Sequence, residues 1–299
     1  MRALQIGDSI SELKVKHGQL IAHNRSSEIE NKQAPLEDLG IVVIESLNGL
    51  NLNLHVLQGF LESNTALVVC DRRHLPAGVL LPLFGTLDHG AVLAAQFALS
   101  RPQSKRIWKR LIAAKLRHQA KNLPLSSRKR KRIQSLAAGV KSGDPDNYEA
   151  QGARIYWKAL FGDQFRREPR AGEGINAALD YGYAVVRATL ARAIVGSGLH
   201  PSVGVFHSPR ANPMCLVDDL IEPLRPLVDR HIANLETEII GKLNPENKRE
   251  IVGVLTESFM TKDKSGLLGE VCERYADSYK RFITSGSEKI DIPTWRHDG

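Results

Sequence analysis

Residues 207–222 contain the side chains of this chain that are best suited to bind a divalent cation. Asn212-Pro213 predicts the start of a helix, because Asn is a favoured N-cap residue and proline suits the first helical position. The first turns of that helix would carry Asp218, Asp219 and Glu222. Asp218 and Glu222 are four residues apart and are expected to point from one face, whereas Asp219 lies about 100° further round. His207 comes shortly before, close enough to share a pocket with that face.

A histidine with one or two carboxylates is a donor set for a divalent metal ion. Oxygen ligands suit Mg²⁺, and an imidazole shifts the preference towards Mn²⁺ or heavier ions. Spacing alone leaves open that His207 is a packed or capping residue. Glu149, at the start of a predicted helix over 149–161, is a second candidate ligand. The alternative is that Glu149 is a first-turn carboxylate that stabilises the helix dipole.

The charge of the chain is concentrated in one segment. The whole chain has 41 Lys and Arg against 33 Asp and Glu, a net charge of +8. Residues 101–143 contain 14 of these bases and no acid, and subtracting 14 from 41 leaves 27 bases against 33 acids elsewhere. Such a basic segment on a mildly acidic body indicates a polyanionic partner such as nucleic acid. A solvated basic helix, or a localisation-like tract at 128–132, is the alternative.

Composition places the chain among ordinary globular proteins. It has 299 residues, of which 42% are hydrophobic and 25% charged. No stretch approaches the ~18 apolar residues of a membrane span, and the first residues lack the apolar run of a signal peptide. Three cysteines far apart in the sequence argue against a disulfide framework. We therefore expect a soluble protein of the reducing cytoplasm with no membrane partner.

The hydrophobic pattern changes along the chain from strands to helices. Residues 13–16 and 20–22 flank the short connection His17-Gly18-Gln19, which is typical of a hairpin, and 41–44 and 66–70 are β-branched runs. A short helix is predicted over 54–61, and turn residues at 73–78 and 83–90 predict a linker. From about residue 92 the period is helical, with further helices predicted at 175–194, from Pro213, after Asn244-Pro245 and over 268–283. The pattern predicts an α+β chain, with a small β-rich domain at 1–80 and a larger all-α domain at 81–299.

Seven blocks of sequence, taken in order, match a known family. They are residues 35–39, 70–76, 115–120, 147–157, 175–183, 198–207 and 218–226. Together they resemble the spacer-acquisition integrase of CRISPR systems, the family called CRISPR-associated protein one. The last two blocks, with Glu149 upstream, carry the most specific part of the resemblance. The sequences of residues 198–201 and 222–226 are most similar to those of the family form found beside type II effector nucleases.

The resemblance implies an N-terminal β-sandwich, which also serves dimerisation, and a helical, DNA-binding catalytic domain. It implies that Glu149, His207 and Glu222 are the catalytic metal ligands for Mg²⁺ or Mn²⁺, with Asp218 as a second choice for the acidic ligand. The implied reaction is a transesterification in which 3′-hydroxyl ends of a captured DNA fragment attack the borders of a CRISPR repeat. No covalent protein nucleophile is needed, so Tyr148 is expected to pack or to contact DNA.

The resemblance also implies partners in a prokaryotic cytoplasm. These are double-stranded DNA, a second copy of the chain, and a dimer of the small CRISPR-associated protein two. Two homodimers of this chain would bracket that dimer and form a heterohexamer. The RNA-guided effector nuclease is a further candidate partner. Two alternatives stay open, a branched-DNA endonuclease without integration and a non-catalytic DNA-binding scaffold. We expect the phosphate contacts to come from the basic segment, through Lys105, Arg106, Lys109, Arg110, Arg128, Lys129, Arg130, Lys131 and Arg132.

Overall fold

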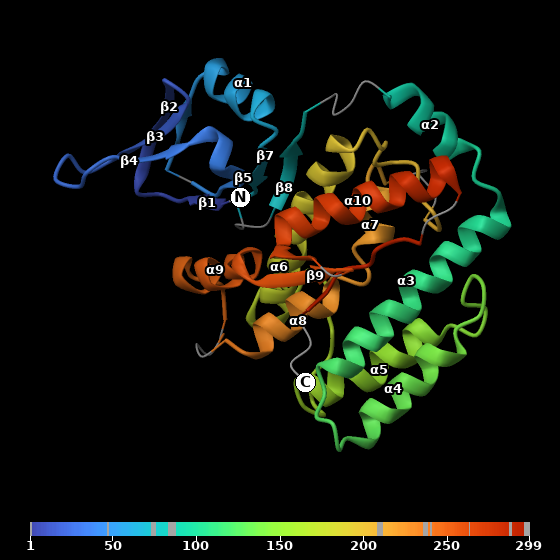
Figure 1. Cartoon of the computed structure of the whole chain (residues 1–299). Helices are drawn as coiled ribbons and strands as arrows, with labels where there is room; N and C mark the ends of the chain where they lie inside the picture. Colours follow the sequence, from blue (N-terminus) through green and yellow to red (C-terminus); the bar gives the residue numbers. More distant parts are fainter. Residues whose placement is uncertain are drawn as a thin grey trace.

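Two sheets form the N-terminal part of the chain (Figure 1). The computed structural model describes residues 2–46, 48–72, 76–82, 88–207, 212–235, 239, 241–262, 264–286 and 289–295. One sheet has the strand order β1-β5-β7-β8, and the other has the order β4-β3-β2-β6. Their strands are β1 (Arg2–Ile6), β2 (Ile10–Lys16), β3 (Gln19–Asn24), β4 (Lys32–Pro35), β5 (Leu39–Ile44), β6 (Asn51–Leu52), β7 (Ala66–Cys70) and β8 (Pro76–Leu80).

The predicted hairpin and short helix are both present. β2 and β3 pair in antiparallel fashion, and the two connecting residues, His17 and Gly18, have φ of 52° and 72°. Two successive positive φ values suit a tight hairpin turn, which explains the glycine. The short helix α1 (Leu54–Glu62) links the parallel strands β5 and β7. Its N-cap is Asn53, whose side chain accepts a hydrogen bond from the Val56 amide.

Strands β5 and β7 are apolar on both sides because each lies between two cores. In β5, Val42 and Ile44 belong to a core shared by the two sheets and α1, whereas Ile41 and Val43 belong to the core of the helical part. Successive side chains of a strand point to opposite faces, so a strand covered on both faces needs an unbroken apolar run. The sheet packs on helix α6 (Gly174–Gly196), and the N-terminal strands therefore share their core with the helices.

The C-terminal part is mainly helical, with α3, α4 and α5 grouped at one end of the molecule (Figure 1). No helix in the described part of the chain combines the length and the apolarity that a membrane crossing requires. The predicted helices are present, including the N-cap at Asn244 with proline at the start of α9. The helix predicted to start at Asn212-Pro213 begins two residues later, at Cys215, with Met214 at the N-cap position. Besides α1 and α6 the helices are α2 (His89–Phe97), α3 (Arg101–Lys121), α4 (Arg128–Gly139), α5 (Tyr148–Leu160), α7 (Cys215–Leu220), α8 (Arg225–Ala233), α9 (Pro245–Val252) and α10 (Leu268–Ser285), with 3-10 turns at Leu36–Asp38 and Gly253–Thr256.

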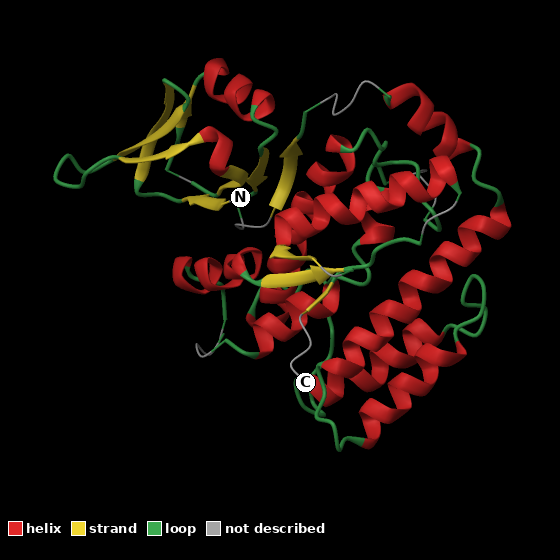
Figure 2. Cartoon of the chain, viewed as in Figure 1, coloured by secondary structure: helices red, strands yellow, loops and turns green. Residues whose placement is uncertain are grey.

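The prediction that this part is all-α was wrong. A three-stranded sheet with the order β10-β9-β11 lies among the helices (Figure 2). Its strands are β9 (Ser258–Thr261), β10 (Lys264–Leu267) and β11 (Thr294–Trp295). These strands have only two to four residues, too short to show an alternating pattern, and β11 is brought to β9 from the far end of the sequence.

The predicted linker also needs correction. Residues 76–80 form β8, the antiparallel edge strand beside β7, rather than a connection between domains. Pro76 at the start of this strand is compatible with an edge position. Residues 73–75 and 83–87 of the predicted linker lie outside the described residues.

Candidate active site

Helix α3 carries the residue at the centre of the candidate site, Lys115. Ser100 caps the helix with a reciprocal capping box to Gln103. Lys115 lies on the buried face of α3 and is only 9% exposed. Its Nζ lies 2.5 Å from Oε1 of Glu149 and also forms an ion pair with Oε2 of Glu222. One buried ammonium group therefore joins two carboxylates from segments 73 residues apart in the sequence.

Glu149 is positioned by the capping of α5. Asn147 has a left-handed φ of 51°, and its side chain accepts a hydrogen bond from the Ala150 amide. Asp144 accepts hydrogen bonds from the amides of Tyr148 and Glu149, at 2.9 and 3.0 Å. These bonds satisfy amides of the first helical turn that have no partner within the helix. They fix the turn from which the Glu149 side chain reaches Lys115, with 30% of that side chain exposed.

Glu222 is held between two cations. Besides Lys115, its carboxylate accepts a hydrogen bond from Nε of Arg225 at 2.9 Å. Burial by itself would raise the pKa of Glu222, but the charges of Lys115 and Arg225 outweigh it and lower the pKa to about 2. Burial by itself would lower the pKa of Lys115, but the charges of Glu222 and Glu149 outweigh it and raise the pKa. Glu222 is therefore an ionised carboxylate inside the protein.

His207 is oriented by Asp219, which is fully buried. Nδ1 of His207 lies 2.5 Å from Oδ1 of Asp219, and Asp219 also accepts hydrogen bonds from the amides of Val205 and Phe206 at 2.6 and 2.8 Å. The hydrogen bond to Asp219 is the main reason that the pKa of His207 is raised, with burial acting against it. A carboxylate on Nδ1 leaves Nε2 as the free ring nitrogen, an arrangement that is common for metal-binding histidines. The ring also lies edge-on to Trp108 of α3, with centroids 5.8 Å apart.

The structure contradicts the prediction that Asp218 and Glu222 project from one helical face. Helix α7 ends at Leu220, and Glu222 lies in the turn before α8. Pro223 explains the break, because the residue before a proline disfavours helical geometry. Asp218 instead forms an ion pair with Arg187, with 2.5 Å between Nε and Oδ1, and accepts a hydrogen bond from Asn212 at 2.6 Å. Burial raises the pKa of Asp218, and these partners lower it below the usual range.

The residues of the predicted triad contact helix α3 at two positions on nearly the same face. Glu149 and Glu222 meet at Lys115, and His207 contacts Trp108, which is seven residues away on the same helix. Seven residues correspond to about 10 Å along a helix axis, with nearly the same face presented. Among the described residues no three His, Cys, Asp or Glu side chains are grouped closely enough to hold a metal ion as they stand. The ammonium group of Lys115 lies between the two carboxylates.

The basic residues singled out from the sequence lie on two neighbouring helices. Lys105, Arg106, Lys109 and Arg110 are exposed on α3. On α4 the exposed basic residues are Arg128, Lys129, Lys131 and Arg132. Arg130 is half-buried and donates a hydrogen bond to the Leu123 carbonyl oxygen at 2.8 Å. α3 and α4 pack against each other. Two exposed basic rows therefore lie on adjoining helices, and their contact with DNA stays a prediction.

Sequence reasoning missed two residues of the site. The spacing places Asp219 about 100° from Asp218 on the predicted helix and assigns it no role, yet it is the carboxylate that orients His207. Lys115 is the first residue of the matching block 115–120, and the sequence alone predicts no role for it. Its neighbours Leu111, Ile112 and Leu116 are buried, and a charged residue inside such an apolar stripe signals a buried ion pair.

Known proteins share the family and the fold of this chain. The model of the family described as CRISPR associated protein Cas1 matches residues 4–258. The CRISPR-associated endonuclease Cas1 of Neisseria meningitidis serogroup C (strain 8013) is 36% identical over 230 residues, which cover 76% of this chain and 75% of that protein.

Two solved structures share the fold. A casposase bound to integration product has a TM-score of 0.78 at 22% identity, covering 98% of this chain and 93% of that chain. A chain of a Cas6-RT-Cas1–Cas2 complex has a TM-score of 0.72 at 17% identity, covering 97% of this chain and 36% of that chain.

Proposed function

Because this chain belongs to the CRISPR associated protein Cas1 family, we propose that it is a metal-dependent DNA integrase of CRISPR adaptation. In this reaction the 3′-hydroxyl ends of a captured DNA fragment attack phosphodiesters at the borders of a CRISPR repeat. One phosphodiester bond forms as another breaks, so the step needs no nucleotide hydrolysis. The fold shared with a casposase bound to integration product supports joining rather than cutting as the outcome.

The observation that carries the proposal is the convergence of Glu149 and Glu222 on one buried cation, with an oriented imidazole on the same face of α3. The chemistry of these donors suits Mg²⁺ or Mn²⁺, and the three side chains would have to lie closer together than they do in the structure to share one ion. The carboxylates of Glu149 and Glu222 would supply the oxygen ligands, and Nε2 of His207 would supply a nitrogen ligand when the ring is neutral. Asp219 favours the required tautomer by accepting a hydrogen bond from Nδ1–H of His207.

When bound, the metal would polarise the scissile phosphate and stabilise the attacking and leaving oxygens. The protein residues position the reaction around it. Lys115 holds Glu149 and Glu222 in place, and Arg225 also pairs with Glu222. The exposed cations of α3 and α4 would bind phosphates of the fragment and the target duplex without reading bases.

The proposed assembly follows the family. We propose a homodimer, and two homodimers bracketing a dimer of the small partner protein, Cas2, as a heterohexamer. A chain with this fold occurs in a Cas6-RT-Cas1–Cas2 complex, which supports the small partner. Association with a type II RNA-guided effector nuclease stays a prediction.

A strand-transfer assay tests the proposal. The purified protein, its small partner, a labelled fragment with free 3′-hydroxyls and a supercoiled plasmid carrying the repeat would be incubated with Mg²⁺, with Mn²⁺ or with EDTA. We expect label joined to the plasmid at the repeat borders, only in the presence of metal. Cleavage without joining would instead indicate a branched-DNA nuclease, and binding with neither product would indicate a scaffold.

Matched variants locate the activity. We expect Glu149→Gln and His207→Ala to abolish joining while the protein still binds the fragment. Glu168→Gln, a change at an exposed carboxylate, should leave joining intact. Heat of Mn²⁺ binding, measured by calorimetry, separates loss of the metal site from loss of DNA binding. Full activity of Glu149→Gln would refute the assignment of the site.

A further inference from the structure

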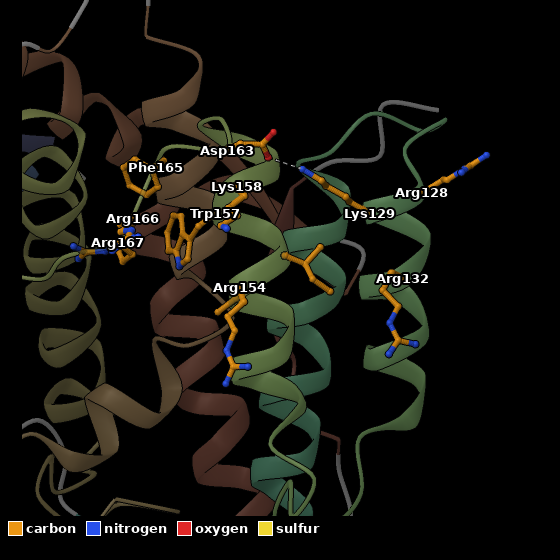
Figure 3. Close-up of a pocket in the computed structure, with 12 residues that line it drawn as sticks. Arg128, Lys129, Arg132, Arg154, Trp157, Lys158, Asp163, Phe165, Arg166 and Arg167 are labelled. Carbon is orange, nitrogen blue, oxygen red and sulfur yellow. Dashed lines mark hydrogen bonds and ion pairs between the residues drawn. The ribbon is translucent and has the colours of Figure 1, made fainter.

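A pocket outside the candidate active site lies on α5 and the loop that follows it, facing α4 (Figure 3). Its volume is about 790 Å³. Trp157 and Phe165 line its apolar part, and Figure 3 shows them between the cations of α4 on one side and Arg166 and Arg167 on the other. None of these aromatic residues contributes to the site at Lys115.

The charge of this pocket is almost entirely positive. Seven cations line it, against one acid, Asp163, which forms an ion pair with Lys129 at 3.2 Å. Arg167 is neutralised by Asp180. Among the described residues, the structure gives no acidic partner to the other five, Arg128, Arg132, Arg154, Lys158 and Arg166. A surface with five unneutralised cations attracts an anionic ligand.

The aromatic part of the pocket is rigidly supported. The indole of Trp157 contacts the rings of Tyr156, Phe161 and Phe165, with centroids 5.1, 6.1 and 5.9 Å apart. Phe161 and Phe165 also contact each other at 4.9 Å. Trp157 is half-buried, so part of its ring surface stays accessible. A fixed indole surrounded by cations combines a stacking surface for bases with contacts for phosphates, the combination that single-stranded nucleic acid recognition uses.

We propose that this pocket binds unpaired nucleotides of DNA, with a base stacked on Trp157 and phosphates contacted by Arg154, Lys158 and Arg132. Duplex DNA does not suit it, because paired bases keep their faces within the helical stack. Trp157 is eight residues after Glu149 on α5, about 12 Å along the helix axis. An unpaired strand held in the pocket would therefore lie within reach of the candidate active site. The inference rests on the proposed function in one respect, namely that the polyanion is DNA.

Oligonucleotide binding measured in EDTA tests the pocket without catalysis. A loss of binding to the pocket can therefore be distinguished from a loss of strand transfer. The probes are a short oligothymidylate and a blunt duplex, titrated by fluorescence anisotropy and by tryptophan quenching. We expect Trp157→Leu to weaken oligothymidylate binding by about 5- to 150-fold, the equivalent of ~1–3 kcal/mol for one stacked base. Duplex affinity should change by less than about twofold, because phosphate contacts elsewhere dominate it.

Two further variants separate stacking from folding and from charge. Trp157→Phe keeps an aromatic ring, so it should retain most of the binding while losing the part of the quenching that comes from Trp157; Trp108 and Trp295 remain in this variant. Arg154→Gln should weaken oligothymidylate binding more than Lys16→Gln, which removes one exposed positive charge from a distant hairpin. Thermal melts of all variants report whether the fold is intact.

Three results would overturn the proposal. One is equal oligothymidylate affinity in the wild type, Trp157→Leu and Trp157→Phe. Another is a loss of duplex affinity as large as the loss of single-strand affinity, which would indicate a general electrostatic surface. The third is displacement of the oligothymidylate by polyglutamate at equal charge concentration, which would indicate an acidic peptide as the occupant.

Discussion

Removing the charge of Lys115 should destabilise the fold more than removing that of any exposed lysine. Lys115→Met keeps the length of the side chain but leaves Glu149 and Glu222 facing each other without the shared cation. Loss of one partner of a buried ion pair costs about 3–5 kcal/mol. Arg225 still neutralises Glu222, and Glu149 keeps 30% of its side chain exposed. We therefore expect a loss of about 2–4 kcal/mol in the free energy of unfolding.

The assay is urea unfolding followed by far-ultraviolet circular dichroism at neutral pH. Lys109→Met is the matched control, because Lys109 is an exposed lysine of the same helix, and its effect should stay within about 0.5 kcal/mol. The double variant Lys115→Met/Glu222→Gln should recover part of the loss, since it removes the uncompensated carboxylate together with its partner.

A divalent cation offers an independent test of the same reasoning. If the two carboxylates bind a shared cation, Mn²⁺ should raise the melting temperature of Lys115→Met by more than it raises that of the wild type. The reasoning would be refuted if Lys115→Met and Lys109→Met unfolded at the same urea concentration. It would also be refuted if the double variant lost the sum of the two single losses.

Three further predictions follow from contacts elsewhere in the molecule. Asp219→Asn should move the acidic limb of the strand-transfer pH profile to lower pH, because Asp219 raises the pKa of His207 and proton binding there competes with metal binding; an unchanged profile would exclude His207 as the titrating group. His118 is buried, which lowers its pKa to about 4, so the unfolded chain takes up the proton first and stability should fall from about pH 6.5 towards pH 4, by about 2 kcal/mol at pH 5. His118→Asn, which keeps an N–H for the Pro223 carbonyl oxygen, should lose that part of the pH dependence in urea titrations. Gly182→Ala would place Cβ 2.6 Å from Val228 and 3.2 Å from Ile251, so we expect a loss of about 1–3 kcal/mol, whereas Gly90→Ala meets nothing within 4 Å and should be neutral or stabilising in thermal melts.

The elements that could be predicted from the sequence are those that are specified by residues within them or next to them. The β2–β3 turn needs two positive φ values, and the sequence offers Gly18 there. The start of α9 at Asn244-Pro245 is specified by capping chemistry. The β9–β11 sheet could not be predicted, because its strands are very short and the pairing of β11 with β9 joins Trp295 to Phe259, which lie on either side of α10 in the sequence. Long-range pairing leaves no periodic trace in such short segments.

The candidate site shows the same division. The spacing of apolar residues predicts the helix that carries Glu149, and the sequence places His207 shortly before an acidic segment. The choice among Asp218, Asp219 and Glu222 was not, because it depends on where α7 ends and on which cations lie opposite. Arg187 neutralises Asp218, and Lys115 and Arg225 neutralise Glu222. These partners come from distant parts of the chain, so each carboxylate has a different role although the three lie within five residues.

The contrast between Glu222 and Asp229 shows why burial alone does not identify a ligand. Both carboxyl groups are buried, at 7% and 1% exposure. Burial raises the pKa of Asp229 to about 7 even though the hydroxyls of Tyr183 and Tyr156 donate hydrogen bonds to it. Glu222 contacts two cations directly, and its pKa falls to about 2. Neutral hydroxyls can satisfy a carboxyl group without keeping it ionised, whereas a paired ammonium and guanidinium keep it charged and therefore able to bind a cation. Asp229 is accordingly a structural link between α5, α6 and α8, whereas Glu222 keeps the charge that the proposed metal site would need.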